Sequence, residues 1–565
     1  MTGRDPLTLA VTGMLPLVLI TAAAIALPVS LFLLWLYRRS VLRSMRVRTT
    51  PPGAVEPEGT ASLGAPSSAT SAARPTVLRI EAVDGASAVR VGPRAAALLR
   101  EARRAPWRTA AVYALGGLAY AVVMATAFQL TSDGTIRPVR SALLVWTYAW
   151  PVVLVVRLVA GSGRRTRIAA VGVYFAVLLG FFALAVVLSP AVSLGQLLFL
   201  WADMNVPPTL LMLAFLNRRV RAVGPLVIAF MILAILGANL ALSAAEPEDR
   251  LRRIVDIGSA LGLEAYGMLL GILLVGAAFF AVLAGLGLLW IRRRYEAGKI
   301  SDQSLTIDAL WLVFGVVEST NLVFSGARWL LACPAALVAY KLVCLAGFSV
   351  TARRATTEPP PILLLLRVFS LGHRSERLFD ALATHWRHVG LVRLIAGPDL
   401  ATTTVEPHEF LDFVSGRLGR RFIDGPAALE RRIAETRSHP DRDGRFRVGE
   451  FFCHDDTWHV VLARLAGEAD AVMMDLRGFS TANAGCIFEV QSLVNVVPVP
   501  RVALVYDDTT DRRFLDETLD RAWAALRADS PNRAAAEGAL RLVRYDGPRA
   551  FPSLLRSLCA AASAT

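Results

Sequence analysis

The residues with the clearest potential for chemistry lie at 475–494, in the segment DLRGFSTANAGCIFEVQSLV. This segment leaves an apolar strand, turns, and begins a helix that presents Glu489 in its second or third turn. A carboxylate in such a place can stabilise positive charge that develops on a substrate, and Arg477 with Ser480 could meet phosphates or position the loop. Two further candidates for ligand binding, Phe369 and Ser370, lie at the end of the first strand of the same region.

Two of these candidates also have a plain structural interpretation. Glu489 could be a carboxylate in the first turns of a helix, where the helix dipole favours negative charge. Arg477 could pair with Asp475, two residues earlier in the chain. The sequence leaves both interpretations open.

The histidines and cysteines favour no metal site. Asp455 and His459 in CHDDTWH are four residues apart on one helix face, but an aspartate cap on a helix that begins near Thr457 explains them better. His385 and His388 are expected on a solvated helix face. The five cysteines have no paired spacing, so the sequence predicts neither a disulfide framework nor a zinc site.

The elements that must position these residues are short apolar strands that alternate with amphipathic helices beyond residue 359. Strands are expected at 362–369, 391–396, 446–452, 471–476, 501–506 and 540–545, and helices at 375–389, 405–419, 426–436, 456–467, 482–495, 511–528 and 548–561. The alternation predicts a doubly wound, flavodoxin-like α/β domain whose ligands bind at the carboxyl ends of parallel strands. G-x-G-x-x-G, P-loop and G-x-S-x-G motifs are absent from the sequence, so the corresponding dehydrogenases, NTPases and hydrolases are not expected.

This domain resembles the Toll/interleukin receptor (TIR) family. In that family a strand is followed by Ser-x-x-x-x-Ser-x-Trp-Cys-x-x-Glu-Leu, and here Cys486, Glu489 and Val490 take the Cys, Glu and Leu places, with Gly485 in place of Trp. RVFSLGHRSERLFDALATHWRHVGLVRLIAGPDL is similar to the family's opening strand, loop, helix and second strand, and VPVPRVALVYDD to the strand after the glutamate helix. The segment 397–445 is longer than in the family.

The resemblance implies a reaction. Catalytically competent TIR domains cleave the nicotinamide glycosidic bond of NAD, and they need the glutamate at this helix position, so Glu489 inherits that role and NAD is a substrate rather than a cofactor. Departure of neutral nicotinamide leaves an oxocarbenium-like ribose, which a carboxylate can stabilise as in glycosidases. A non-catalytic TIR-like module that self-associates through the cytosolic domain is the alternative from another functional class.

Charge and hydropathy place the rest of the chain in a membrane. Hydrophobic residues make up 55% of the sequence, and the net charge is +15. Residues 1–358 carry 34 Lys and Arg against 18 acidic residues, whereas 359–565 carry 26 against 27. Because the basic excess belongs to the apolar part, it marks cytoplasmic loops of a protein whose partner is the lipid bilayer, and nucleic acid is excluded as a partner.

Nine apolar segments are long enough to cross ~30 Å of hydrocarbon. They lie at 11–37, 109–130, 141–160, 168–190, 192–216, 224–244, 264–291, 308–326 and 328–350. Because every second loop is rich in arginine, the N-terminus is expected outside and the C-terminal domain in the cytosol of a multi-pass plasma-membrane protein. The predicted fold is therefore an α-helical membrane bundle of about nine helices with a C-terminal cytosolic α/β domain.

The expected domain boundaries follow from these segments. They are an N-terminal transmembrane anchor at 1–48, a mostly disordered cytosolic linker at 49–106, the helical bundle at 107–352 and the TIR-like domain at 359–565. Pro, Gly, Ala and Ser dominate the first half of the linker. A hairpin around Asp84 and Gly85 is expected near its far end.

Four polar residues within the predicted spans suggest a third function. Asp203, Asn205, Glu318 and Asn321 would line a pathway if the bundle were a transporter or channel with a regulatory cytosolic domain. The plainer interpretation is that Asp203 and Asn205 mark a broken helix end near the interface. Lys341 is not level with Glu318, so no ion pair between them is predicted.

Overall fold

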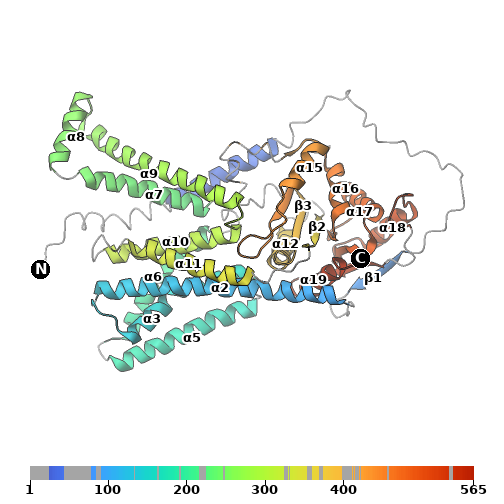
Figure 1. Ribbon diagram of the computed structural model, residues 1–565, viewed down its shortest axis with the longest axis horizontal. Coiled ribbons are helices and arrows are strands. Elements are labelled where there is room, and N and C mark those ends of the chain that lie inside the picture. Colours follow the sequence, from blue (N-terminus) through green and yellow to red (C-terminus); the bar gives the residue numbers. More distant parts are fainter. Residues whose placement is uncertain are drawn as a thin grey trace.

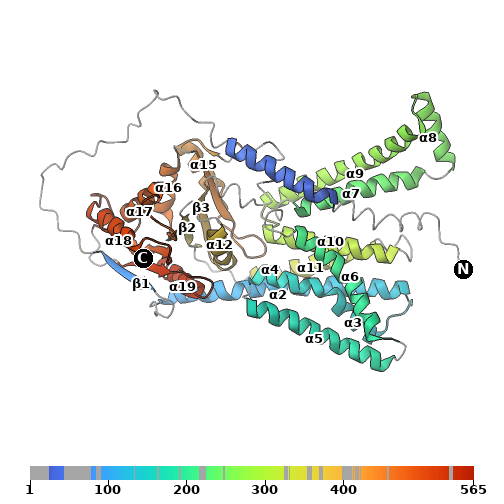
Figure 2. The same cartoon turned by 180° about the vertical axis from the view of Figure 1, so that it is seen from behind.

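The chain is described here from a computed structural model, in which a set of long helices lies at one end and a β-sheet with its own helices at the other (Figure 1). The structure describes residues 24–43, 78–83, 91–132, 134–161, 164–189, 192–215, 224–245, 248–323, 329, 331–352, 359–367, 373–396, 410, 413, 416, 419, 422–454, 457–533 and 539–564. Figure 2 shows the same two parts from behind.

The helical part agrees with a membrane bundle. Its helices are Ala24–Arg43, α2 (Pro93–Ser132), α3 (Pro138–Tyr148), α4 (Trp150–Ala160), α5 (Arg164–Leu188), α6 (Leu194–Phe215), α7 (Gly224–Ala245), α8 (Glu248–Ala260), α9 (Ala265–Glu296), α10 (Asp302–Val323) and α11 (Ala332–Ala352). Within the described residues, six helical segments are long and apolar enough to cross a membrane: Ala24–Arg43, α2, α3 with α4, most of α5, α9 and α11. Helices α6, α7 and α10 occupy the ranges of the three other predicted spans.

Helix α2 packs closely against α10 and α11 because two of its residues lack a side chain. A Cβ atom at Gly117 would lie 2.5 Å from the Trp311 ring on α10, and one at Gly116 would lie 2.5 Å from Cys344 Sγ on α11. The rings of Tyr120 and Trp311 have centroids 4.6 Å apart. Small residues allow such approach in membrane bundles, where dispersion contacts replace the hydrophobic effect between helices.

The sheet contains eight strands, and every pair is parallel. The strands are β1 (Arg79–Val83), β2 (Ile362–Arg367), β3 (Leu391–Ala396), β4 (Phe422–Ile423), β5 (Val448–Cys453), β6 (Ala471–Asp475), β7 (Val502–Tyr506) and β8 (Ala539–Arg544), in the order β1-β8-β7-β6-β2-β3-β5-β4. All six predicted strands are confirmed, with ends shifted by up to two residues. The parallel sheet predicted from continuous apolar runs is therefore present.

Helices cover both faces of this sheet. They are α12 (His373–Trp386), α15 (Pro426–Glu435), α16 (Trp458–Glu468), α17 (Ala484–Val496), α18 (Arg512–Ala524) and α19 (Phe551–Ala561). Alternate residues of β2 enter two separate cores: Leu363 and Leu365 pack with α12 and α19, whereas Leu364 and Leu366 pack with α15 to α18. The predicted helix at 405–419 lies almost wholly outside the described residues.

The predicted linker requires a correction, because parts of it belong to the sheet domain. β1 lies parallel to β8, with Val83 opposite Val543, and the first turns of α2 bury Ala95 and Ala102 in the same core as Leu554 of α19. Residues 79–83 thus extend the edge of the sheet, and residues 93–106 pack over one of its faces. The second arm of the predicted hairpin lies outside the described residues.

Candidate active site at the carboxyl end of the sheet

The strand order reverses direction at β2, which defines where a ligand should bind. The chain passes from β2 to β3 on one side, and it later returns to β6 on the other side. In doubly wound sheets, ligands occupy the crevice at the carboxyl ends of the strands beside such a point. β2 ends at Arg367, directly opposite Asp475 at the end of β6.

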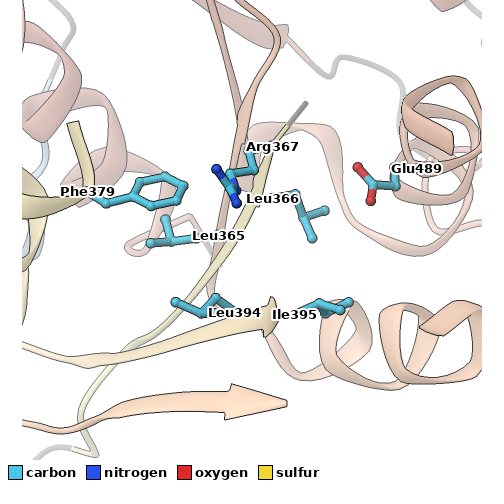
Figure 3. Close-up of a pocket in the computed structure, with 7 residues that line it drawn as sticks. All are labelled: Leu365, Leu366, Arg367, Phe379, Leu394, Ile395 and Glu489. Carbon is cyan, nitrogen blue, oxygen red and sulfur yellow. The ribbon is translucent and has the colours of Figure 1, made fainter. Parts of the chain in front are cut away.

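A small pocket lies at this place. Its lining combines one carboxylate and one guanidinium with apolar side chains: Leu365, Leu366, Arg367, Phe379, Leu394, Ile395 and Glu489. The cavity itself is only about 10 Å³, close to the room that one water molecule needs, within a partly open space of about 290 Å³. Figure 3 shows the Glu489 carboxylate directed from α17 toward the other lining residues.

Glu489 faces the sheet because of its position on α17. Cys486, Val490 and Leu493 are buried at helical spacing on the same side of the helix. Cys486 Sγ lies 4.0 Å from the carbonyl oxygen of Arg367, so α17 packs directly on the end of β2. The apolar stripe of α17 therefore carries its one carboxylate to the carboxyl edge of the sheet.

The environment of Glu489 favours its neutral form. The side chain is only 3% exposed, and its Oε2 atom has no hydrogen-bond partner in the described part of the chain. Burial raises the pKa of Glu489 to about 8. A carboxylate stabilised by the helix dipole would be solvated with a lowered pKa, so the burial of Glu489 does not fit that interpretation.

Arg367 is a pocket residue that the sequence did not single out. Its side chain is 6% exposed, and its guanidinium carbon lies 6.0 Å from the Phe379 ring centroid, turned toward that ring (Figure 3). Phe379 belongs to α12. The available signal was the single arginine that ends the otherwise apolar strand ILLLLR.

Arg477 is held by Asp475 and does not line the pocket. Its Nε atom donates to Asp475 Oδ1 at 2.8 Å and its terminal nitrogen to Oδ2 at 2.7 Å, while the guanidinium carbon lies 5.3 Å from the Tyr545 ring centroid. Asp475 is fully buried. This is the pairing that the sequence offered as the structural alternative, and it orders the turn that follows β6.

Of the other predicted site residues, the structure describes Ser480. The Ser480 backbone nitrogen and Oγ lie 2.9 Å and 3.2 Å from Asn483 Oδ1, in the loop before α17. Ser480 is not among the residues that line the pocket. Phe369 and Ser370 lie outside the described residues.

The described histidine candidates make contacts other than metal ligation. Within the described residues, no three His, Cys, Asp or Glu side chains are arranged to hold a metal ion. His454 Nε2 lies 3.1 Å from Asp424 Oδ1, and His459 stacks on Trp458 with ring centroids 3.7 Å apart. His388 corrects the prediction of a solvated face, because its side chain is only 8% exposed.

The polar residues of the predicted spans differ in their surroundings. Asn205 is buried and donates from Nδ2 to a carbonyl one turn earlier in its own helix, at 3.1 Å, whereas Asp203 is exposed on α6. Glu318 is buried on α10. The side chain of Asn321 lies outside the described residues.

Comparisons with known proteins give no further guidance. No family model matches the chain, and neither a curated protein nor a solved structure matches it.

Proposed function

We propose that this chain is a membrane-anchored TIR-like signalling or defence effector whose cytosolic domain hydrolyses NAD at the nicotinamide glycosidic bond through Glu489. The observation that carries the proposal is a buried carboxyl group with a pKa of about 8, directed into a pocket at the carboxyl ends of parallel strands. Carboxyl groups with such raised pKa values are concentrated at functional sites.

The order of the strands supports the TIR-like part of the proposal. When β1, β4 and β5 are treated as additions, the remaining order is β3-β2-β6-β7-β8. Numbered along the chain, this is the order 2-1-3-4-5 of a flavodoxin-like sheet. The long segment between β3 and β6 then accounts for the two additional strands at that edge, β5 and β4.

The proposed reaction needs an ionised Glu489. The bond between ribose C1′ and the nicotinamide nitrogen breaks, its electron pair goes to the ring, and neutral nicotinamide leaves. The ionised carboxylate stabilises the positive charge on the ribose until water attacks C1′, and ADP-ribose and a proton are the other products. Arg367, which lines the same pocket, supplies a positive charge for a phosphate of NAD.

The membrane part of the proposal concerns topology. We propose nine spans with the N-terminus outside and the sheet domain in the cytosol, where NAD is available. The carboxyl end of α9, which carries Arg293 and Arg294, touches the sheet domain through a hydrogen bond from Arg437 to the Glu296 carbonyl oxygen, 3.1 Å. A basic helix end on the side of this domain agrees with the positive-inside rule.

The test uses the full chain in nanodiscs at high surface density. Wild type should release nicotinamide from NAD, with a rate that rises about tenfold per pH unit below pH 8 because only the ionised carboxylate acts. Glu489→Gln and Glu489→Ala should abolish release. Glu517→Gln, at an exposed position on α18, should not change it. A well-folded, clustered wild type that releases no nicotinamide would overturn the proposal.

One surface favours the non-catalytic alternative. Among the described residues beyond 359, Val460 and Phe488 are the exposed large aliphatic or aromatic side chains, at 51% and 39%. Phe488 contacts His459 edge to face, with ring centroids 4.4 Å apart. If the domain acts by assembly, Phe488→Ser should reduce its self-association in crosslinking experiments, while Glu489→Gln should leave self-association unchanged.

A further inference from the structure

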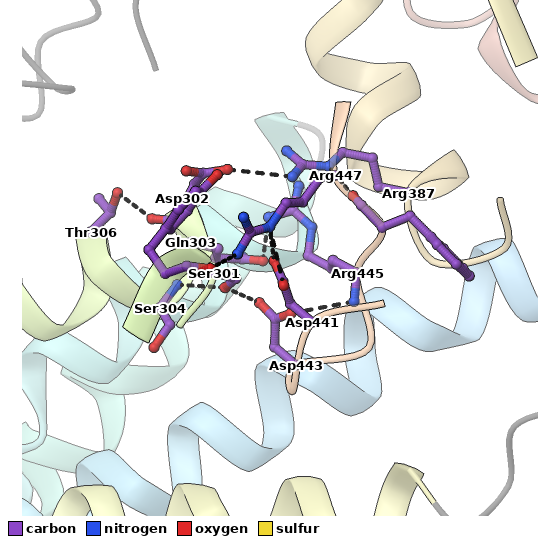
Figure 4. A network of polar contacts seen from close by, with 12 residues as sticks. Ser301, Asp302, Gln303, Ser304, Thr306, Arg387, Asp441, Asp443, Arg445 and Arg447 are labelled. Atoms are coloured by element: carbon purple, nitrogen blue, oxygen red, sulfur yellow. Dashed lines mark hydrogen bonds and ion pairs between the residues drawn. The ribbon is translucent and has the colours of Figure 1, made fainter. Parts of the chain in front are cut away.

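The start of α10 meets the sheet domain in a cluster of polar and charged side chains. We call it the junction cluster: Ser301, Asp302 and Gln303 at the start of α10, with Arg387, Asp443 and Arg445 of the sheet domain (Figure 4). The two groups are far apart in the sequence. The cluster therefore joins the helical bundle to the domain that carries the pocket.

Direct hydrogen bonds cross this junction. Ser301 Oγ donates to the Asp443 carboxylate, and an Arg445 guanidinium nitrogen donates to Gln303 Oε1 at 2.5 Å. Arg387 and Asp302 form an ion pair at 3.5 Å. Asp443 and Arg387 are only 4% and 6% exposed, so neither charge can turn to water when its partner moves.

A second set of contacts holds the preceding turn. Arg447 donates to the Tyr295 carbonyl oxygen at 2.6 Å and to that of Ile300 at 3.2 Å, and its guanidinium carbon lies 3.7 Å from the Tyr295 ring centroid. Asp441, only 4% exposed, accepts from Arg447 Nε at 2.9 Å. The turn between α9 and α10 is thus fixed to the segment that leads into β5.

Two elements that line the Glu489 pocket, α12 and β3, are connected to these contacts. Arg387 directly follows α12, the helix that carries Phe379 in the pocket wall. Its Nε atom donates to the Phe446 carbonyl oxygen, and the Phe446 backbone nitrogen donates to the Arg387 carbonyl oxygen. Arg447 precedes β5 directly, and β5 pairs with β3, whose Leu394 and Ile395 form another wall. A shift of the α10 start therefore reaches the pocket through one helix and one strand pair.

The position of α10 is set inside the bundle by a further charge pair. Asp308, about two turns after Ser301, forms an ion pair with Lys341 on α11. The same lysine approaches Ser304 Oγ at 3.4 Å. Charges within a membrane protein are costly unless paired, so α10 and α11 are held in register by this contact.

We propose that α10 regulates the Glu489 pocket, with the junction cluster transmitting its displacement to α12 and β3. A conformational change in the bundle then changes the structure of the pocket. The effect on catalysis rests on the proposed NAD hydrolysis, whereas the effect on pocket structure does not. Coupling of this kind is reciprocal, so a change in the pocket must also alter the junction.

The experiment measures hydrogen exchange and nicotinamide release of the full chain in nanodiscs. Ser301→Ala removes the bond to Asp443, and Lys341→Met unpairs Asp308 far from the pocket. Both should accelerate exchange of the α12 and β3 amides by about tenfold and alter nicotinamide release. The controls Ser349→Ala, an exposed serine on α11, and Lys299→Met, an exposed lysine, should leave both readouts unchanged.

A reciprocal variant covers the case in which the bundle variants do not fold. Phe379→Leu reshapes the pocket wall and should change exchange at 297–303, across the junction. Unchanged α12 and β3 exchange in a folded Lys341→Met, or unchanged 297–303 exchange in Phe379→Leu, overturns the regulation. If the variants show these exchange effects but wild type releases no nicotinamide, the proposed hydrolysis fails and the coupling stands.

Discussion

Glu489 combines a carboxyl group with almost complete burial, and this has a consequence for stability that is independent of any substrate. Its pKa is raised to about 8 by desolvation, above the ordinary value of 4.5. Between these two pH values the native state retains a proton that the unfolded state releases. Stability is therefore highest at low pH and falls as the pH rises through this window, by about 1.4 kcal/mol per pH unit.

Replacement of Glu489 by glutamine should remove this dependence. Because glutamine does not titrate, the unfolding temperature of the sheet domain in Glu489→Gln should exceed that of wild type by a margin that grows from pH 5 to pH 8. Differential scanning calorimetry of the full chain in nanodiscs measures both. Glu517→Gln is the matched control, since Glu517 is 54% exposed. Parallel curves for wild type and Glu489→Gln would contradict the raised pKa.

The buried pair of Asp475 and Arg477 gives a second prediction at the residue scale. Asp475→Ala leaves the guanidinium buried without its bidentate partner, and we expect a loss of about 3–5 kcal/mol in the free energy of unfolding. The double variant Asp475→Leu with Arg477→Met should recover most of that loss, because neither charge of the pair remains. If the double variant is as unstable as Asp475→Ala, the pair is not the source of the loss.

Sequence reasoning found some of these residues and missed others for definite reasons. Asp475 and Arg477 are two residues apart, so their pairing is a local property. Glu489 could be named from the pattern around Cys486. Arg367 was missed: the lone arginine at the end of ILLLLR was its only local signal, and its place in the pocket depends on the packing of α12 and α17 around the end of β2.

At the scale of elements, strands that are buried on both faces were the easiest to predict. β2, β6 and β7 are nearly continuous apolar runs, and such runs are typical of central parallel strands. β4 is only two residues long, and β1 pairs with β8, more than 400 residues away in the sequence. Neither a very short strand nor so distant a partner leaves a periodic signal.

The pairing of β1 with β8 can be tested by proline substitution. Adjacent backbone N–H groups of a strand point to opposite sides, so the double variant Ile80→Pro with Glu81→Pro must remove the donor that faces β8. We expect exchange of the β8 amides to accelerate by about tenfold. Ile80→Thr with Glu81→Thr, which retains both donors, should exchange like wild type. Equal exchange in the two double variants would exclude the pairing.

At the scale of the whole molecule, the boundary between the two parts does not follow the order of the sequence. α2 contributes to the bundle through Gly116 and Gly117, and to the core of the sheet domain through Ala95 and Ala102. Composition correctly predicted that the chain contains apolar helices and a separate domain of near-neutral charge. It could not show that one 40-residue helix belongs to both, because its N-terminal turns are rich in arginine and alanine and look like a soluble segment.

Because α2 belongs to both parts, we expect the C-terminal segment alone to be an incomplete domain. A fragment of residues 359–565 lacks β1 at the edge of β8 and the α2 turns that cover α19, so apolar surface of Leu554 and its neighbours becomes exposed. A fusion of residues 78–108 to 359–565 restores that cover. We expect the fusion to be monomeric in size-exclusion chromatography and to unfold at least about 5 °C above the shorter fragment, because 1 kcal/mol corresponds to about 2–4 °C for a domain of this size. A shorter fragment that matches the fusion in both measurements would show that the α2 turns contribute nothing to the sheet domain.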